Sequence, residues 1–96
     1  MWVGKVIGTV VATPKDDSLT GCKLLIVRPA DFCRGDDRDK PVIAVDTIGA
    51  GTGETVLVVE GSSARHVSGR PNGAVDAAIV GIIDSIEIDQ DLLREP

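Results

Sequence analysis

The chain has 96 residues, enough for one small domain with a thin core that neighbouring chains would help to stabilise. One Trp, one Phe and no Tyr leave aliphatic side chains to fill the interior, and this composition favours β structure. The formal net charge of −5 repels phosphate backbones and the chain has no basic stripe, which argues against nucleic acid as a partner.

The first residues and the cysteines indicate a cytoplasmic chain that has no membrane-spanning segment and binds no cofactor. The start at Met1–Lys5 lacks the charged head and long apolar run of a signal peptide, and no apolar stretch approaches the roughly 20 residues that span a bilayer. Cys22 and Cys33 do not form a Cys-x-x-Cys pair, and one histidine cannot complete a usual zinc set. We expect free thiols, with a disulfide or a bound metal as the less favoured alternative.

The first predicted strand runs from Trp2 to Thr13, where apolar residues alternate along the chain. This alternation places one set of residues on a single face: Trp2, Gly4, Val6, Gly8, Val10 and Ala12. Turn formers and charges from Pro14 to Gly21 predict a surface loop. A second strand is expected from Cys22 to Arg28, where Pro29 ends it by removing a donor from the ladder.

A highly charged segment, Asp31–Lys40, follows, and we predict a solvated hairpin loop because seven of its ten residues are charged. Its acidic residues resemble oxygen ligands for a hard cation: Asp31, Asp36, Asp37 and Asp39. Arg34-Gly35-Asp36 also spells an adhesion tripeptide. We interpret both as chance, because the spacing of a calcium loop is absent and a cytoplasmic chain meets no integrin.

A glycine-rich loop, Gly49-Ala50-Gly51-Thr52-Gly53, separates the third predicted strand, Pro41–Thr47, from the fourth, Glu54–Glu60. A phosphate-binding glycine loop needs a strand before it and a helix after it, so that the helix N-terminus meets the anion. Here a strand follows, so a nucleotide site is the less favoured alternative. The three glycines instead suit a place where backbones approach closely, at a barrel end or the axis of a ring.

The segment after the fourth strand, Ser62–Arg65, is predicted to be the cap and first turn of a short helix. An enzymatic alternative makes Ser62 or Ser63 a nucleophile, His66 its base and Asp76 the orienting carboxylate. We favour the cap, because the sequence is not a Gly-x-Ser-x-Gly elbow and so small a core leaves little space for a substrate pocket.

The last segments complete the predicted set of elements. Val67–Gly73 is a predicted loop, and Ala74–Ala77 is a candidate for one helical turn. The final strand, Ala78–Ile83, is apolar on both faces and must therefore be covered twice. Beyond it an acidic tail to Pro96 either frays or lies against a neighbour.

Five short strands and one short helical turn predict an all-β domain spanning residues 1–96, a small closed or nearly closed five-stranded barrel of the oligonucleotide-binding type with a C-terminal extension. Nucleic-acid binders of that architecture need basic grooves and aromatic platforms, whereas this chain offers Trp2, Phe32 and an acidic balance. We therefore interpret the barrel as a building block, with a small ligand- or nucleic-acid-binding barrel as the alternative.

Four segments in order resemble the vertex proteins of bacterial microcompartments, also called the EutN/CcmL family. They are Gly4–Thr13, Ser18–Leu25, Ala44–Arg65 with its glycine-rich loop, and Val75–Asp84. Two features depart from the family pattern: Ala74 stands where a proline is common, and the Asp31–Lys40 loop is unusually charged. On these residues the chain is identified as a member of the family.

The resemblance implies a structural protein without enzymatic activity, which assembles as a homopentamer and caps the five-fold vertices of a microcompartment shell within the cytoplasm. It implies self-association and contact with hexameric and pseudohexameric shell proteins, without nucleic acid or membrane. Head-to-tail contacts between identical subunits close into a ring when the rotation divides a full turn. As hypotheses, one group of residues lies at the five-fold axis or a subunit interface: Gly49, Ala50, Gly51, Gly53, Ser62, Ser63 and Arg65.

Arg65 is the residue we expect to contribute most to the subunit contact. Its planar donor fork suits a carboxylate or carbonyl across an interface. The alternative is a solvated arginine that contributes well under ~1 kcal/mol.

Overall fold

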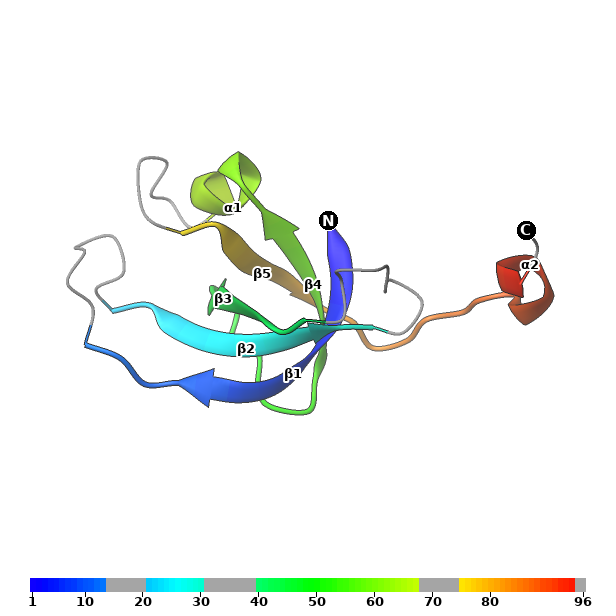
Figure 1. Cartoon of the computed structure of the whole chain (residues 1–96), viewed down its shortest axis with the longest axis horizontal. Helices are drawn as coiled ribbons and strands as arrows, with labels where there is room; N and C mark the ends of the chain where they lie inside the picture. Colours follow the sequence, from blue (N-terminus) through cyan, green and yellow to red (C-terminus); the bar gives the residue numbers. More distant parts are fainter. Residues whose placement is uncertain (14–20, 31–39, 68–74, 95–96) are drawn as a thin grey trace.

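The computed structural model describes residues 1–13, 21–30, 40–67 and 75–94. Within these ranges it forms the five predicted strands, the short helix predicted after the fourth strand, and a second short helix that the sequence did not predict (Figure 1). In chain order these are β1 (Trp2–Val10), β2 (Lys23–Pro29), β3 (Val42–Asp46), β4 (Thr55–Glu60), α1 (Ser62–Val67), β5 (Ala77–Ile82) and α2 (Gln90–Arg94). The prediction of an all-β fold with five strands is confirmed.

The strands close into a barrel in the order β1-β2-β3-β5-β4, with β4 returning to β1. Among the described strands, β3 and β5 run parallel and the other neighbours are antiparallel. α1 lies between β4 and β5 in sequence and at the end of the barrel where β4 finishes (Figure 1). Closure pairs each strand on both sides, so the sheet has no open edge.

Aliphatic side chains fill the barrel, and the largest that are fully buried are Leu25, Ile79, Val6, Val27, Val56 and Val58. Ala77 and Ile79 of β5 belong to this inner cluster. Ala78, between them, belongs to a second cluster that includes Ala64 of α1 and Val59 of β4. The prediction that the last strand is covered on both faces is therefore confirmed, because α1 covers the outer face.

The predicted alternation along the first strand is wrong beyond Val6. The register pairs Val6 with Val27 and Gly8 with Ile26, so Ile7 is an extra residue, a β-bulge. Directly paired residues share a face, and Ile26 and Val27 face opposite sides. Gly8 therefore lies on the face opposite to Val6. The strand also ends at Val10 instead of Thr13.

Two predictions about helical segments need correction. Gly61, at φ +66°, accepts the first helical hydrogen bond from the Arg65 N–H at 3.2 Å, so Gly61 and not a serine occupies the cap. The proposed helical turn at 74–77 is not present in its described part. There the Asp76 carbonyl accepts from the Gly61 N–H at 2.9 Å, and Ala77 begins β5. Strand pairing with β4 has overridden the helix preference of alanine.

Several predicted features lie outside the described residues. These are most of the three loops at 14–21, 31–40 and 67–73, together with Phe32, Cys33, Ala74, the aspartates of the charged segment and the Arg34-Gly35-Asp36 tripeptide. The expectation of free thiols stays a prediction, because Cys33 lies outside the described residues. Within the described part of the chain, no helix has the length and apolar character needed to cross a membrane, and no cluster of side chains suits a metal ion.

Candidate functional site

The glycine-rich loop joins β3 to β4 and is fastened to β1 by its backbone. The Gly53 N–H donates to the Val6 carbonyl at 2.8 Å, and the Val6 N–H donates to the Glu54 carbonyl at 2.9 Å. The Glu54 N–H donates to the Gly51 carbonyl at 3.1 Å, which closes a tight turn around Thr52 and Gly53. Gly53 has φ +92°, a conformation that favours glycine.

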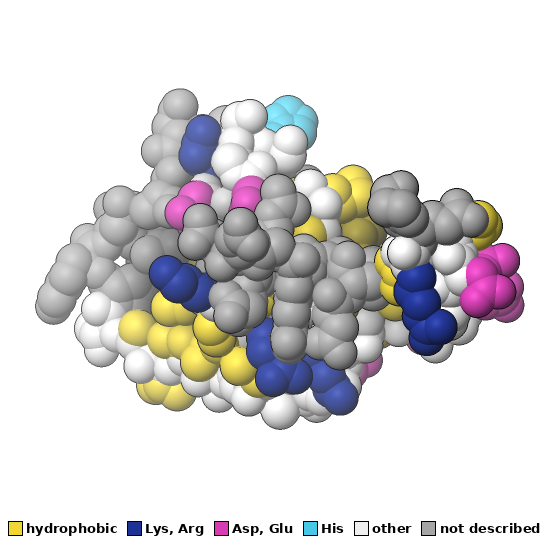
Figure 2. Space-filling model, turned by 45° about the vertical axis from the view of Figure 1, so that its right-hand side comes forward, with side chains coloured by type: hydrophobic (Ala, Val, Ile, Leu, Met, Phe, Trp, Pro, Cys, Tyr) yellow, Lys and Arg dark blue, Asp and Glu magenta, His cyan; other side chains and the backbone are white. Residues whose placement is uncertain are grey.

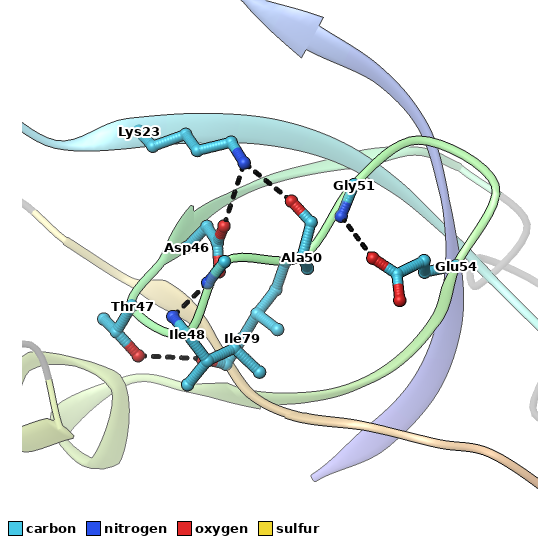
Figure 3. Close-up of polar contacts among 9 residues, drawn as sticks. Lys23, Asp46, Thr47, Ile48, Ala50, Gly51, Glu54 and Ile79 are labelled. Atoms are coloured by element: carbon cyan, nitrogen blue, oxygen red, sulfur yellow. Dashed lines mark hydrogen bonds and ion pairs between the residues drawn. The ribbon is translucent and has the colours of Figure 1, made fainter.

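A buried carboxylate holds the other half of the loop (Figure 3). Asp46, the last residue of β3, has a side chain that is only 1% exposed, and its Oδ1 accepts from the backbone N–H groups of Ile48 at 3.0 Å and Gly49 at 3.1 Å. Lys23 is paired with Asp46 across β2 and β3, and its Nζ lies 3.3 Å from Asp46 Oδ2. The same Nζ donates to the Ala50 carbonyl at 2.7 Å. We call this arrangement the Asp46 clasp.

The clasp keeps the Asp46 carboxylate ionised. Burial favours the neutral acid and by itself raises the pKa of Asp46. Backbone N–H groups of the loop, that of Ile48 first among them, and the Lys23 ammonium stabilise the anion and outweigh burial, so the pKa of Asp46 lies below its ordinary value of 3.8. Among the described residues, Asp46 Oδ2 has no hydrogen-bond partner, and the ion pair with Lys23 stabilises its negative charge.

Two further contacts hold the middle of the loop and the residue that follows β3 (Figure 3). The Gly51 N–H donates to Glu54 Oε1 at 2.7 Å, and the Thr47 hydroxyl donates to the Ile79 carbonyl of β5 at 3.1 Å. Ala50, at the centre of the loop, is fully buried in the inner cluster. The loop is therefore a rigid part of the barrel wall.

This geometry disfavours the nucleotide alternative. The loop is followed by β4, not by a helix. The N–H groups of Ile48, Gly49, Gly51 and Gly53 all donate to acceptors within the chain, so they are not available to a phosphate.

Ser62, Ser63 and Arg65 belong to α1, which follows β4, whereas the glycine-rich loop precedes it. The structure thus places the two predicted groups at opposite ends of β4 (Figure 1). Ser62 and Ser63 are exposed, and Arg65 is half-buried. His66 and Asp76 are also exposed, so the enzymatic alternative lacks the buried orienting carboxylate that a triad uses.

Sequence reasoning missed Lys23 and Asp46, which hold the loop in shape. A signal for Asp46 exists, because an aspartate directly before a turn often accepts hydrogen bonds from the backbone two or three residues on. Lys23 has no comparable local signal, since its role depends on the pairing of β2 with β3.

Comparison with known proteins gives consistent results. Residues 1–84 match the family model described as ethanolamine utilisation protein EutN/carboxysome. The chain is 51% identical to the bacterial microcompartment shell vertex protein GrpN of Rhodospirillum rubrum, over 91% of this chain and 97% of that protein. It is 48% identical to the shell vertex protein PduN of Salmonella typhimurium, over 90% of this chain and 98% of that protein.

A solved structure supports the same relationship. The structure described as the GrpN pentameric microcompartment shell protein from Rhodospirillum rubrum superposes with a TM-score of 0.78 and 48% identity, covering 93% of this chain and all of that one. The resemblance noted in the sequence is thereby confirmed: this chain belongs to the EutN/carboxysome family.

Proposed function

We propose that this chain is a structural protein that assembles as a homopentamer and caps the five-fold vertices of a bacterial microcompartment shell in the cytoplasm. The observation that carries the proposal is the similarity to GrpN, whose structure is described as pentameric and matches 93% of this chain. The partners are copies of the same chain and, around the vertex, the hexameric and pseudohexameric shell proteins.

The barrel suits this role physically. A closed sheet leaves side chains and loops as the means of contact, and unlike faces of identical subunits can meet head to tail around an axis. Large apolar side chains that the single chain leaves exposed include Ile7, Ile43 and Ile48. Their number on so small a domain supports burial against other chains.

We propose that the glycine-rich loop lies at the five-fold axis, through Gly49, Ala50, Gly51 and Gly53. Gly51 has no positive φ, and a Cβ added there would make only ordinary contact, at 3.5 Å from Glu54 Oε1. The fold of the single chain therefore leaves room for a side chain at Gly51. Close approach of a neighbouring backbone would account for its absence.

We propose that α1 lies in the subunit interface, through Ser62, Ser63 and Arg65. The two serine side chains are exposed at the barrel end, next to the half-buried Arg65. A guanidinium there can reach a carboxylate or carbonyl of the next subunit while its stem packs on the barrel.

Native mass spectrometry of the purified chain tests the proposal. We expect a particle of five times the monomer mass that persists at low micromolar concentration. A chain that stays monomeric at cellular concentration would contradict the proposal, and a monomer that retains bound oligonucleotide would favour the nucleic-acid alternative.

A further inference from the structure

The residues that follow β5 form an arm that leaves the barrel. The Ile83 N–H donates to the Thr55 carbonyl at 2.8 Å, and beyond this bond residues 84–94 run away from the sheet and end in α2 (Figure 1). Asp89 starts α2, because its Oδ1 accepts from the N–H groups of Asp91 at 2.9 Å and Leu92 at 3.2 Å. We call residues 84–94 the arm.

The arm carries apolar side chains that its own chain does not cover. Leu92 is 62% exposed and Leu93 49%, and α2 contains no buried residue. A helix of five residues is far shorter than the roughly 12–15 that an isolated helix needs in water. The helix therefore requires a surface to pack against.

The arm is also acidic. It contains Asp84, Glu87, Asp89 and Asp91 against Arg94. Figure 2 shows acidic side chains at the end of the molecule that carries α2, next to basic ones. Its partner surface should therefore combine apolar area with positive charge.

The outer face of β1, β2 and β3 has this combination. Ile26 is paired with Ile43, which is 54% exposed, so the two lie side by side on the outer face. Lys5 and Arg28 form an exposed pair on the same face of β1 and β2. Ile7, at the bulge, adds a further exposed apolar side chain. Figure 2 shows hydrophobic side chains beside Lys and Arg side chains at the height of β1 and β2. We call this set of five residues the β1–β3 patch.

We propose that the arm of one copy docks on the β1–β3 patch of the next copy in the ring. This inference rests on the proposed pentamer and specifies one of its contacts. The acidic arm and the cationic patch are complementary, and each chain carries one of each. A head-to-tail contact uses both surfaces once per subunit, which is the requirement for ring closure. The arm points away from its own barrel, so its apolar side chains are available to a neighbouring copy.

Chemical cross-linking between engineered cysteines tests the contact. In a chain with Cys22→Ala and Cys33→Ala, we would introduce Ile43→Cys together with Leu92→Cys and add a short bismaleimide. The matched control combines Leu92→Cys with Val11→Cys, which lies exposed beyond the end of β1. We expect a ladder up to pentamer on a denaturing gel for the first variant. The control should stay largely monomeric or dimeric.

A second pair of variants keeps the test decisive if the cysteine variants assemble poorly. Leu92→Glu with Leu93→Glu alters exposed side chains of the full-length chain without touching the barrel core. We expect the concentration at which the ring half-dissociates to rise at least about tenfold, against no change for Val11→Glu.

The outcomes separate this proposal from the proposed function. A parent chain that is pentameric, with no specific ladder and an unweakened ring in the arm variant, would overturn the arm contact and leave the vertex role intact. An intramolecular cross-link without a ladder would also overturn it. A parent chain that never forms a ring would instead overturn the proposed function itself.

Discussion

The Lys23 ammonium and the Asp46 carboxylate lie 3.3 Å apart at paired positions of β2 and β3, and together they hold the glycine-rich loop. The carboxylate binds the backbone at Ile48 and Gly49, and the ammonium binds the Ala50 carbonyl. One buried anion and one half-exposed cation thus hold Ile48 and the first two residues of the segment that we propose for the five-fold axis, Gly49 and Ala50.

Replacing the Asp46 carboxylate should destabilise the barrel. Asp46→Ala removes the oxygen that accepts from the N–H groups of Ile48 and Gly49, and it removes the ion-pair partner of Lys23. We therefore expect a loss of about 1–3 kcal/mol in the free energy of unfolding. Urea denaturation at a fixed protein concentration measures this. Asp84→Ala, at an exposed position, is the control and should change stability by under about 0.5 kcal/mol. Equal effects of the two substitutions would contradict the role of the clasp.

The clasp also predicts how stability depends on pH. The pKa of Asp46 is lowered in the folded chain, so its stabilising contribution is fully present above the ordinary value of 3.8 and is lost as pH falls through the folded pKa. The difference in melting temperature between the parent and Asp46→Asn should therefore shrink on acidification below about pH 4. Thermal melts from neutral to acidic pH measure it. A difference that grows on acidification would show that Asp46 is not held as an anion.

Gly4 should not tolerate alanine. A Cβ at Gly4 would lie 2.6 Å from Val27 Cγ1 and 2.8 Å from the Arg28 carbonyl oxygen, so backbone must move. We expect Gly4→Ala to cost about 1–3 kcal/mol or more. Gly8→Ala is the matched control in the same strand, because its Cβ would meet only Ile26 Cδ1 at 3.6 Å. Comparable losses for the two variants by urea denaturation would be inconsistent with this packing.

Gly51 should tolerate a larger residue in the monomer but not in the ring. A Cβ fits there within one chain, so Gly51→Leu should keep the parent's circular dichroism spectrum. If the loop lies at the axis, the pentamer population in native mass spectra should fall sharply. Ala12→Leu, exposed beyond the end of β1, is the control. A Gly51→Leu pentamer that assembles like the parent would show that the loop lies away from the axis.

Arg65 should matter for assembly more than for folding. We expect Arg65→Ala to weaken the ring by about tenfold or more in dissociation concentration, because arginine at an interface often contributes over about 1 kcal/mol. Analytical ultracentrifugation across a dilution series measures this. His66→Ala, at the exposed neighbouring position, should leave the ring unchanged. An unaltered oligomer at low concentration for Arg65→Ala would remove this residue from the interface.

The sequence predicts the strands well, because each apolar run between turn formers is a local signal. The cores of β2, β4 and β5 fall where the runs at 24–27, 56–59 and 78–83 place them. The resemblance to the family likewise follows from local residues in a fixed order. In the turn at 51–54, Gly53 lies at φ +92°, a backbone conformation that favours glycine.

The features that the sequence does not reveal depend on contacts between distant residues. Ile7 becomes a bulge only because β2 pairs with two parts of β1 in different register. The loss of the predicted turn at 74–77 follows from the pairing of Gly61 with Asp76. The Lys23 contact with Ala50 joins residues 27 positions apart. The pattern of residues within one short segment carries no information on which distant residues will pair.

The Asp46 clasp has a consequence for assembly as well as for the fold of one chain. Association normally costs free energy wherever a contact segment must be ordered, and a flexible glycine loop would lose much conformational entropy at that step. Here the loop is already immobilised by Asp46, Lys23 and the backbone of β1 before a neighbour arrives. The loop is thus preorganised, so that little of the free energy of its contacts with a neighbour is lost to ordering the loop.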